Sequence, residues 1–487
     1  MAFTDRLANR GSISTGYDIE NSIRLERSDI EYVRRASGGS SGSRTTWTFS
    51  LWFKRTITGE QHFLAEQGSN TWFRIKSSDY LSLRLASGHE FENEGRLFRD
   101  LSAWYHIVVA VDTTQGTASN RVKLYINGVQ ETDFDSEQYP DQNEDLLFGH
   151  FSSENFQLSS NDGDNAFSGY MAEHYWIDGT QYAATDFGEF DEDSENWKPK
   201  KFTGTFGSEG HYLNFDTSGS LGADSSGNSN TFGTLNNIDA TNQTTDTPTN
   251  NFCTLNANDR TISTTYDGQL LNGGLEYQPE SGYSMVRGTM GMTKGKWYWE
   301  CKLVSTSGQN FGVCTANMNI PLASSQSDGF IISSVEGDAE FFSVYAASHY
   351  RSYHVYDGTN WNSAAAWSDT TNFSAGDIFG FAWDGDNLDL YMSKSGSWTG
   401  VLTNQDPEGD PGSNTPFVYH ASINNDENEA WLPVVSNSYN QDMILNFGNP
   451  IHSISSGNSD ANGYGNFEYA VPDGYYALCT KNLAEFG

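Results

Sequence analysis

The stretch TWTFSLWFK at residues 46–54 shows most directly how this chain folds. Apolar side chains occupy every second position in it, and the polar Thr48 and Ser50 lie between them. Successive side chains of a β-strand point to opposite faces of a sheet, so this spacing predicts a half-buried strand. The residues predicted to face the core are Trp47, Phe49, Leu51 and Phe53.

The same strand pattern recurs through the first half of the chain. YHIVVAV at residues 105–111 is apolar on nearly both faces, which is typical of a strand inside a two-sheet sandwich. VKLYI at residues 122–126 runs directly into Asn127-Gly128, a strong hairpin signal because both residues tolerate positive φ. Residues 167–177 supply a further strand, which ends at the turn dipeptide Asp178-Gly179.

The second half repeats this pattern with other residues. KWYWECKL at 296–303 alternates large apolar with polar side chains. IFGFAW at 378–383, an acidic turn and LDLYM at 388–392 together predict a hairpin with a four-residue connection. Helical periodicity is confined to a turn or two around residues 181–186. We therefore predict an all-β protein built from two antiparallel β-sandwiches.

The charge of the chain argues against several classes of protein. Its 487 residues include 27 Lys and Arg against 63 Asp and Glu, a formal net charge of −36. Such a surface repels phosphate backbones and anionic lipid, so we expect neither a nucleic-acid partner nor membrane attachment. No run of about 18 apolar residues is present for membrane insertion. Because the N-terminus has no apolar signal-peptide segment, we expect synthesis in a cytoplasm.

Residues that often form disulfides or bind metals show no such pattern here. The cysteines have neither CxxC spacing nor the density of a disulfide-rich domain. We predict that Cys253, Cys301, Cys314 and Cys479 are buried thiols, with a single bridge as the alternative. His106 and His174 lie within predicted strands, and we expect them to be ordinary strand residues rather than metal ligands.

Composition also divides the chain into parts. Residues 218–251 consist mainly of Gly, Ser, Asn, Thr and Asp, and such a segment buries too little apolar surface to fold alone. Within it, Phe232, Leu235 and Ile238 are candidates for anchoring the segment to a neighbouring sheet. The predicted parts are an N-terminal arm at 1–20, a first sandwich at 21–185, an extended polar connector at 186–255 and a second sandwich at 256–487.

Both predicted sandwiches resemble known modules. The first resembles the concanavalin A-like jelly roll of laminin-G and pentraxin-type modules, and the pieces that carry this resemblance are residues 46–54, 104–112 with 122–128, and 167–173. The second is similar to a SPRY-type β-sandwich through GKWYWE at 295–300, GDIFGFAWD at 376–384 and ILNFG at 444–448. Neither fold determines a function, because both host many activities.

The opening MAFTDRLANRG at 1–11 and WKPKKFTGTFG at 197–207, together with the two sandwiches, resemble lectin-like structural proteins of marine tailed bacteriophages. This resemblance implies a virion component exposed on the particle, such as a tail fibre, a head fibre or a capsid decoration. It implies other virion proteins and a host-surface glycan or protein as partners. By analogy with fibres we expect a homo-oligomer, namely a trimer, with residues 1–20 as its anchor in the virion.

We therefore predict a non-enzymatic protein that attaches a particle to its host through many weak contacts multiplied by copy number. Two alternatives stay open. One is a virion-associated polysaccharide hydrolase of the concanavalin A-like glucanase type, and the other is a structural decoration protein without a ligand.

Candidate ligand residues come from two segments. Sugar rings stack on aromatic planes while Asn, Asp and Arg bind their hydroxyl groups, and residues 345–373 mix both kinds of side chain. The candidates there are Tyr350, Tyr353, Tyr356 and Trp361, with filling of the second sandwich as the alternative. A weaker second candidate, in the first sandwich, consists of Trp72, Arg74 and Tyr80.

An acidic run supplies the catalytic candidates for the hydrolase alternative. Jelly-roll glucanases carry carboxylates at alternate strand positions as nucleophile and acid. Glu189, Asp191, Asp193 and Glu195 have this spacing. The run follows the last recognisable strand of the first sandwich and lacks β-branched neighbours, so we favour a solvated loop.

Calcium is the one cofactor that the resemblance implies. Laminin-G and pentraxin-type modules can hold it at a loop rim through carboxylate and carbonyl oxygens, which hard cations prefer. The candidate ligands are Asp141, Asn143 and Asp145, with Glu144 beside them and Asp162 and Asp164 in another loop. None of them matches a regular twelve-residue calcium loop, and plain solvation is the alternative.

Overall fold

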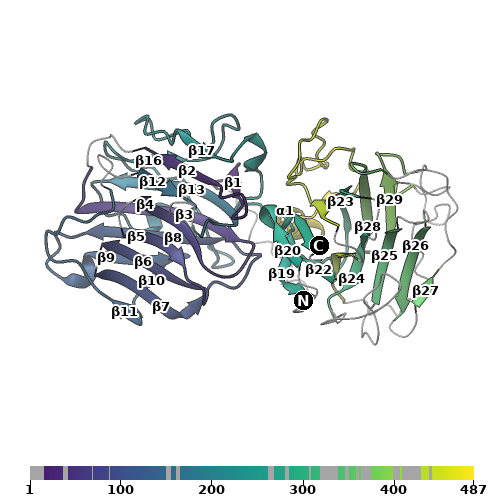
Figure 1. The fold of residues 1–487 in the computed structure, drawn as a ribbon, viewed down its shortest axis with the longest axis horizontal. Coiled ribbons are helices and arrows are strands. Elements are labelled where there is room, and N and C mark those ends of the chain that lie inside the picture. The colour runs from purple at the N-terminus through teal and green to yellow at the C-terminus, as the bar shows by residue number, and fades with distance from the viewer. Residues whose placement is uncertain are drawn as a thin grey trace. The chain divides into compact units, whose positions relative to one another are not determined.

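The computed structural model divides the chain into two compact units, Gly11–Asn251 and Phe252–Gly487. Each unit is built mainly from two antiparallel sheets (Figure 1), which confirms the predicted all-β class. The structure describes residues 16–36, 42–67, 70–86, 88–149, 155–160, 165–261, 268–279, 284–305, 309–317, 338–345, 350–357, 361–363, 374–398, 406–408, 429–437 and 441–487.

Two eight-stranded sheets form the first unit. Sheet A has the order β10-β9-β8-β3-β13-β1-β18, with β16 also paired to β13, and sheet B has the order β11-β7-β6-β5-β4-β12-β2-β17. The strands of sheet A are β1 (Ser22–Leu25), β3 (Thr46–Arg55), β8 (Tyr105–Asp112), β9 (Val122–Ile126), β10 (Val129–Glu131), β13 (Gly169–Asp178), β16 (His211–Leu213) and β18 (Gln243–Thr244). Those of sheet B are β2 (Tyr32–Arg35), β4 (Gln61–Gln67), β5 (Thr71–Ile75), β6 (Tyr80–Ala86), β7 (His89–Leu97), β11 (Ser136–Glu137), β12 (Asn155–Leu158) and β17 (Thr234–Asn236).

Short elements complete the first unit. β14 (Gly188–Phe190) and β15 (Trp197–Pro199) form a separate hairpin. Single 3₁₀ turns span Ala118–Asn120, Ala184–Asp186 and Ala240–Asn242. The second of these lies within the segment 181–186, where the sequence predicted a helical turn. β9 and β10 pair across Asn127-Gly128, whose φ angles of 48° and 78° confirm the predicted hairpin turn.

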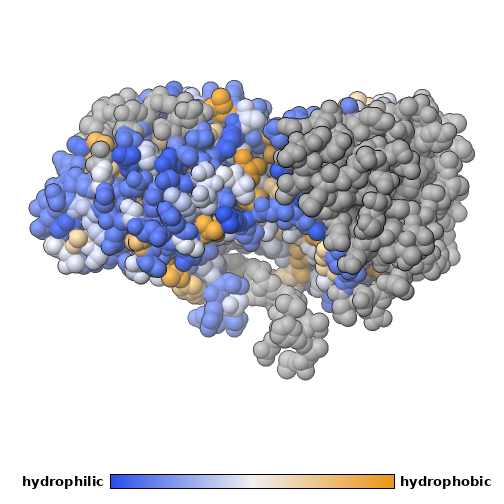
Figure 2. All heavy atoms as spheres, turned by 60° about the horizontal axis from the view of Figure 1, so that its bottom comes forward, coloured by the Kyte–Doolittle hydropathy of each residue, from blue (hydrophilic) through white to orange (hydrophobic). Residues whose placement is uncertain are grey.

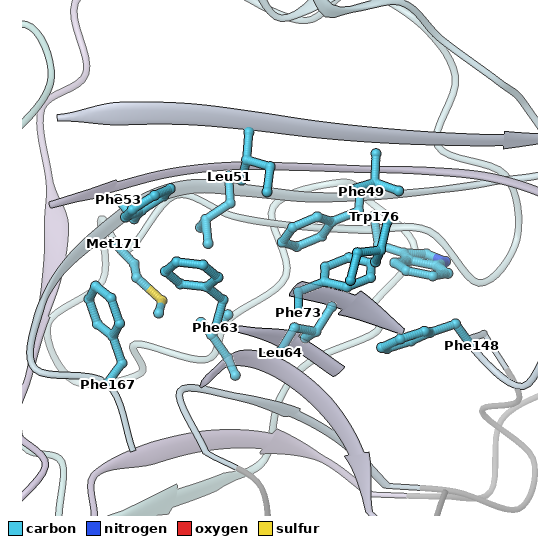
Figure 3. Close-up of a cluster of buried hydrophobic side chains, with 14 of the residues drawn as sticks. Phe49, Leu51, Phe53, Phe63, Leu64, Phe73, Phe148, Phe167, Met171 and Trp176 are labelled. Atoms are coloured by element: carbon cyan, nitrogen blue, oxygen red, sulfur yellow. The ribbon is translucent and has the colours of Figure 1, made fainter. Parts of the chain in front are cut away.

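The core of the first unit lies between sheets A and B (Figure 3). The side chains of Trp47, Phe49, Leu51 and Phe53 all enter it, which confirms the predicted inward face of β3. Trp47 stacks on Trp176 of β13 with ring centroids 4.6 Å apart, and Phe53 contacts Phe63 of β4 at 4.4 Å. Buried aromatic pairs of this kind add to the stability that apolar burial supplies.

The outer face of β3 is buried as well, which differs from the half-buried strand that the alternation predicted. Thr48 and Ser50 have no exposed surface. Segments from both ends of the unit fold over this face of sheet A and cover it with apolar side chains. The buried residues of the two covering clusters are Val108, Tyr175, Ile177, Ala184, Phe187 and Phe202 in one, and Ile19, Trp52 and Ala172 in the other.

Most of the segment 186–255, expected as an extended connector, instead belongs to the first unit, which ends at Asn251. β16 pairs with β13, β17 with β2 and β18 with β1. Phe232 is buried in the core, and Leu235 and Ile238 pack against it, as expected of anchoring residues. Polar side chains also satisfy the backbone here, since the Asn230 amide donates to the carbonyls of Ser208 and Gly210. A polar composition is therefore compatible with an ordered segment.

The end of the predicted N-terminal arm also packs on this unit. Ile19 is buried, and its backbone N–H donates to Oγ1 of Thr249 at 3.1 Å. The Tyr17 hydroxyl donates to the Glu173 carboxylate at 3.0 Å. Residues 1–15 lie outside the described residues, so their expected role as an anchor stays a prediction.

The second unit consists of two seven-stranded sheets. Sheet G has the order β19-β22-β30-β24-β25-β26-β27, and sheet H the order β20-β21-β31-β23-β28-β29, with β32 paired to β23. Sheet G contains β19 (Leu255–Arg260), β22 (Ser284–Gly288), β24 (Gln309–Thr315), β25 (Asp338–Tyr345), β26 (Tyr350–Asp357), β27 (Trp361–Ser363) and β30 (Trp431–Asn437). Sheet H contains β20 (Gly268–Leu271), β21 (Glu276–Pro279), β23 (Lys296–Leu303), β28 (Ile378–Asp384), β29 (Asp389–Lys394), β31 (Met443–Asn446) and β32 (Tyr476–Ala477).

The second core lies between sheets G and H, and Trp299 and Phe381 stack in it with centroids 5.8 Å apart. Four residues connect β28 to β29, as predicted for this hairpin. All four cysteines are buried and free, which confirms the expected core thiols.

The sequence did not predict α1 (Thr480–Phe486), whose seven residues are too few to show a helical period. Its Phe486 stacks on Tyr476 of β32 at 3.8 Å, so tertiary packing stabilises this short helix. Among the described residues, no helix is long and apolar enough to cross a membrane.

Candidate functional site

A row of side chains crosses the outer face of sheet B, the face turned away from the core. β5 shows which side chains belong to this face. Its Phe73 and Ile75 are buried in the core, and the alternating Trp72 and Arg74 therefore point outward. Direct cross-strand partners extend the row from Trp72 over strands β7 to β17. We call these residues the Trp72 row: Glu90, Arg84, Trp72, Ala65, Gln157, Arg34 and Thr234. With strands about 4.8 Å apart, it is on the order of 30 Å long.

Trp72 has two arginines on its ring. The guanidinium carbon of Arg74 lies 4.1 Å from the ring centroid, and that of Arg84 lies 4.7 Å from it. The indole N–H donates to Oγ of Ser82 at 3.1 Å, which fixes the plane of the ring. Cation–π contacts of this length stabilise the cluster. Trp72 is only half-buried, so part of the residue is exposed to solvent.

Two donors of the row lack an acceptor among the described residues. Nε2 of Gln157 and Nε of Arg84 are buried, and neither has a hydrogen-bond partner there. Within the described part of the chain, the Arg84 guanidinium also forms no ion pair. Leaving a buried donor unpaired costs about 1–3 kcal/mol. An oxygen-rich ligand or water that accepts from these groups would recover that free energy.

Charged groups on neighbouring positions of β4, β5 and β7 flank the row. Arg74 donates to Oε1 of Glu60 at 2.9 Å, and Lys76, just beyond β5, donates to Oε1 of Glu92 at 2.8 Å. His62 is the register partner of Arg74 and is buried. Burial, helped by the charge of Arg74, lowers the pKa of His62 to about 4. The imidazole is therefore neutral at pH 7, and the cations of this face are Arg and Lys.

β7 places two carboxylates on the same outer face. Glu90 and Glu92 lie two residues apart, on either side of the buried Phe91, and pair in register with Arg84 and Ser82. Oε1 of Glu90 accepts from the Ser82 hydroxyl at 3.2 Å. This is the alternating arrangement that the sequence analysis sought in the acidic run at 189–195. The sequence analysis missed this strand because the segment HEFENEGRL is so polar. The feature that could have identified the strand is the isolated apolar Phe91 between two glutamates.

Of the predicted ligand residues, Trp72 and Arg74 thus lie together on one surface. The structure adds Arg84, which the sequence analysis missed although the alternation LSLRL at 81–85 carries the signal. Tyr80 lies at the start of β6, with Nζ of Lys76 5.4 Å from its ring centroid. The outer face of sheet B is therefore the best candidate site in the described part of the chain.

The aromatic candidates of the second unit lie on neighbouring strands. Tyr350, Tyr353 and Tyr356 belong to β26, and Trp361 begins β27. The backbone register pairs Tyr356 with Trp361. Their side chains lie outside what the structure describes, so both the ligand site and the core-filling alternative remain predictions.

The acidic run forms the β14–β15 hairpin and its loop. The Asp191 carboxylate accepts from the backbone N–H of Ser194 at 3.0 Å and from Nζ of Lys198 at 3.0 Å. These hydrogen bonds hold the pKa of Asp191 well below its usual range. Asp191 thus fastens the loop, and the other three carboxylates, those of Glu189, Asp193 and Glu195, are exposed. This geometry agrees with the solvated-loop alternative.

The predicted calcium ligands belong to an exposed loop. Among the described residues there is no group of three or more His, Cys, Asp or Glu side chains that could hold a metal ion. Asp141, Asn143 and Asp145 are exposed, and the Glu144 carboxylate accepts from the Asp141 N–H at 2.7 Å and pairs with His89 at 2.8 Å. Asp162 and Asp164 lie outside the described residues. Hydrogen bonds thus organise this loop, and the calcium site stays a prediction.

One contact has the spacing of a catalytic pair without its chemistry. Oγ of Ser50 lies 2.8 Å from Nε2 of His106, and Nδ1 of the same ring accepts the indole N–H of Trp197 at 3.0 Å. Nδ1 must then carry the lone pair, so the neutral ring has its proton on Nε2 and donates to Ser50. A histidine in this tautomer does not remove a proton from the serine. The contact therefore holds β3, β8 and β15 together, and His106 is a strand residue as predicted.

Comparisons with known proteins agree with the first sandwich. The family described as the concanavalin A-like lectin/glucanases superfamily matches residues 31–181, which include β2 to β13. Residues 31–181 form a concanavalin A-like lectin/glucanase domain. The Trp72 row crosses this domain, since all of its members except Thr234 fall within the matched residues. No curated protein matches the chain.

Solved structures similar to part of the chain include two SPRY domains. The SPRY domain of human HERC1 is 15% identical, with 37% of this chain and 96% of that chain covered and a TM-score of 0.24. The PSpry domain of TRIM65 is 13% identical, with 40% and 88% covered and a TM-score of 0.26. A candidate carbohydrate-binding protein from Bacteroides ovatus ATCC 8483 is 15% identical, with 35% and 46% covered and a TM-score of 0.25.

Proposed function

We propose that this chain is a non-enzymatic attachment protein whose first unit binds a carbohydrate along the Trp72 row. The observation that carries the proposal is the centre of that row, where a half-buried indole lies beside buried donors without acceptors. The C–H face of a sugar ring stacks on an indole, and its hydroxyl oxygens accept hydrogen bonds from amide and guanidinium groups. The row offers these two kinds of contact side by side.

A sugar suits this surface better than an apolar protein partner does. Figure 2 shows a largely hydrophilic surface on the visible face of the first unit, with apolar residues scattered over it. In the described part of this unit, the exposed large hydrophobic residues are Ile30, Leu97, Val129 and Phe190. Protein interfaces usually have a contiguous apolar centre. A polar ligand that stacks on one aromatic ring needs no such patch.

The proposed setting is the surface of a phage particle, in line with the sequence resemblance. A single row gives few contacts, and an individual sugar would bind weakly. Many copies on one particle would raise the overall affinity by orders of magnitude, on the order of 10²–10⁴ for linked sites. Detection of the chain by mass spectrometry and immuno-electron microscopy on purified particles tests this setting separately from sugar binding.

Binding can be tested with the purified full-length chain on an array of bacterial surface glycans. We expect selective binding that Trp72→Ala abolishes and Arg84→Ala weakens by at least tenfold. Lys123→Ala, on β9 of sheet A, is the matched control for loss of a positive charge. All variants are compared by circular dichroism to confirm that they fold.

Two results would contradict the proposal. Silence of the wild-type chain on broad arrays would favour the structural decoration alternative. Glycan binding that persists in Trp72→Ala would show that the binding site lies outside the Trp72 row. The aromatic residues of β26 and β27 would then be tested by Tyr353→Ala and Trp361→Ala.

The hydrolase alternative keeps one specific observation in its favour, the pair Glu90 and Glu92 on the outer face of β7. Two residues of a strand advance by about 6.8 Å, near the separations at which paired carboxylates cleave glycosides. Incubation with laminarin or capsular polysaccharide, followed by an assay for new reducing ends, tests whether the protein is a hydrolase. We expect none; release that disappears with both Glu90→Gln and Glu92→Gln would establish the enzyme instead.

A further inference from the structure

Three polar side chains meet on the outer face of sheet A, and one of them comes from a strand at least 192 residues earlier in the chain than the other two. Nζ of Lys54 lies 2.8 Å from Oδ2 of Asp246 and 2.6 Å from Oδ1 of Asn251. The side chains of Lys54 and Asp246 have no exposed surface. Lys54 belongs to β3, and Asn251 is the last residue of the first unit.

Neighbouring groups orient each member of this trio. The Trp104 indole donates to Oδ1 of Asp246 at 3.1 Å, which leaves the other carboxylate oxygen directed at the lysine. The side-chain amide of Asn251 donates to the carbonyl of Ser102 at 2.8 Å, so its own carbonyl is directed at the lysine. The Tyr170 ring centroid lies 5.0 Å from Nζ of Lys54. The nucleophile, carboxylate and amide are thus held together in a site without exposed charge.

We propose that Lys54 and Asn251 form an intramolecular isopeptide bond, with Asp246 transferring the proton. The Asp246 carboxylate takes a proton from the Lys54 ammonium group, and the neutral amine attacks Cγ of Asn251. Asp246 returns this proton to the amide nitrogen as the Cγ–Nδ2 bond breaks, and ammonia leaves. Asp246 then takes the second proton from Nζ and passes it to the ammonia, which departs as ammonium. One Nζ–Cγ bond replaces one Cγ–Nδ2 bond, and the reaction needs no oxidant, metal or second substrate.

The distances suit this reaction. Cγ of Asn251 is one C=O bond, about 1.23 Å, from the oxygen that contacts Lys54. With that oxygen 2.6 Å from Nζ, the reacting carbon lies within about 3.8 Å of the nitrogen. Near-attack geometries have about 3–3.5 Å between reacting atoms, so a small rotation of the Asn251 side chain is sufficient.

The bond would join β3 to the point where the chain leaves the first unit. A pull on residue 252 would then act on β3, in the middle of sheet A, without first detaching β16, β17 and β18. The inference holds whether or not the Trp72 row binds a sugar, because it rests on other residues.

Intact mass spectrometry of the purified full-length chain tests the bond. We expect a mass lower than that of the sequence by one ammonia, after allowance for Met1. Trypsin should fail to cleave after Lys54 and should yield a branched peptide in which residues 45–55 are joined to residues 202–260. Fragmentation of this peptide assigns the link to Asn251.

Three variants and one control make the test specific. Lys54→Arg and Asn251→Ala remove a reacting group, and Asp246→Asn keeps both reacting groups and removes the proton acceptor, so each should have the full mass. Loss of ammonia at Asn127-Gly128 would give a linear peptide and is distinguished by the map. A folded wild-type chain of full mass, with linear peptides ending at Lys54, would overturn the proposal. A branched peptide linked at Asp246 with loss of water would also overturn it.

Discussion

His174 of β13 and His211 of β16 face each other in the core of the first unit, with their Nε2 atoms 3.2 Å apart. Neither ring has exposed surface, and Phe156 and Phe232 contact both of them. At this distance one Nε2 must donate and the other accept, so the two neutral rings have opposite tautomers. A proton added to the pair creates a buried cation, which the positive charge of Arg35 near His211 also disfavours.

This pair should make the first unit sensitive to acid. Burial lowers the pKa of His174 to about 3, and burial together with His174 lowers the pKa of His211. The unfolded chain binds these protons near pH 6.5, so stability is full above that pH and is lost as the pH falls towards 3. We expect the free energy of unfolding to fall by a few kcal/mol between pH 7 and pH 4, measured by urea titration.

A matched pair of variants assigns the acid effect. His174→Gln removes one buried imidazole and should make stability less dependent on pH over this range. Phe232→Leu, which contacts both rings and removes no titratable group, should lower stability but leave its pH dependence unchanged. Equal slopes in the wild type and His174→Gln would show that the pair does not cause the acid sensitivity.

Glu31 should have the opposite pH dependence. Its Oε2 accepts from the Glu26 N–H at 2.7 Å and from the Asn242 amide at 2.9 Å, and burial raises its pKa to about 7. The unfolded carboxyl ionises near pH 4.5, so the stabilisation is complete below that pH and is lost as the pH rises through 7. Glu31→Gln keeps an acceptor oxygen and cannot ionise. Its stability relative to the wild type should therefore rise between pH 5 and pH 8; a constant difference would contradict this.

Gly128 and Gly179 offer a clean comparison of two glycines at positive φ. Their φ angles are 78° and 81°, but a Cβ on Gly128 would lie 2.2 Å from the Trp197 ring, whereas a Cβ on Gly179 has open space. Gly179→Ala should cost about 1–2 kcal/mol for the backbone conformation alone. Gly128→Ala should cost about 2–5 kcal/mol because overpacking is added. Thermal unfolding followed by circular dichroism measures the stability of both variants. Equal losses of stability would show that the Trp197 ring moves aside without cost.

Truncation tests whether 186–251 belongs to the first unit. A chain of residues 1–251 should fold cooperatively, because it keeps both sheets and their cover. A chain of residues 1–185 should aggregate or remain unfolded, since it exposes Trp52, Val108 and Tyr175 and lacks Phe232. Cooperative unfolding of the shorter chain, followed by tryptophan fluorescence, would restore the idea of a separate connector.

Local pattern sufficed for the strands and several turns. Alternation at 46–54 placed Trp47 and Phe49 in the core, and Asn127-Gly128 formed the expected hairpin, because side-chain direction and turn conformation depend on adjacent residues. The structure of the polar segment 186–251 was harder to predict, because composition does not show where the hydrogen-bonding partners of its residues lie. Its Asn and Asp side chains form hydrogen bonds with backbone groups of the same unit. The residue composition of the segment does not predict these contacts.

The candidate sites depend on contacts between residues far apart in the chain. Trp72 and Arg74 could be singled out as a stacking and charged pair, but Arg84, Gln157 and Arg34 join them only through the register of five strands. Lys54 and Asn251 likewise meet only because the end of the first unit folds back over β3. Strand formation follows from neighbouring side chains. The two candidate sites form only because burial of the apolar faces of two sheets brings distant segments of the chain side by side.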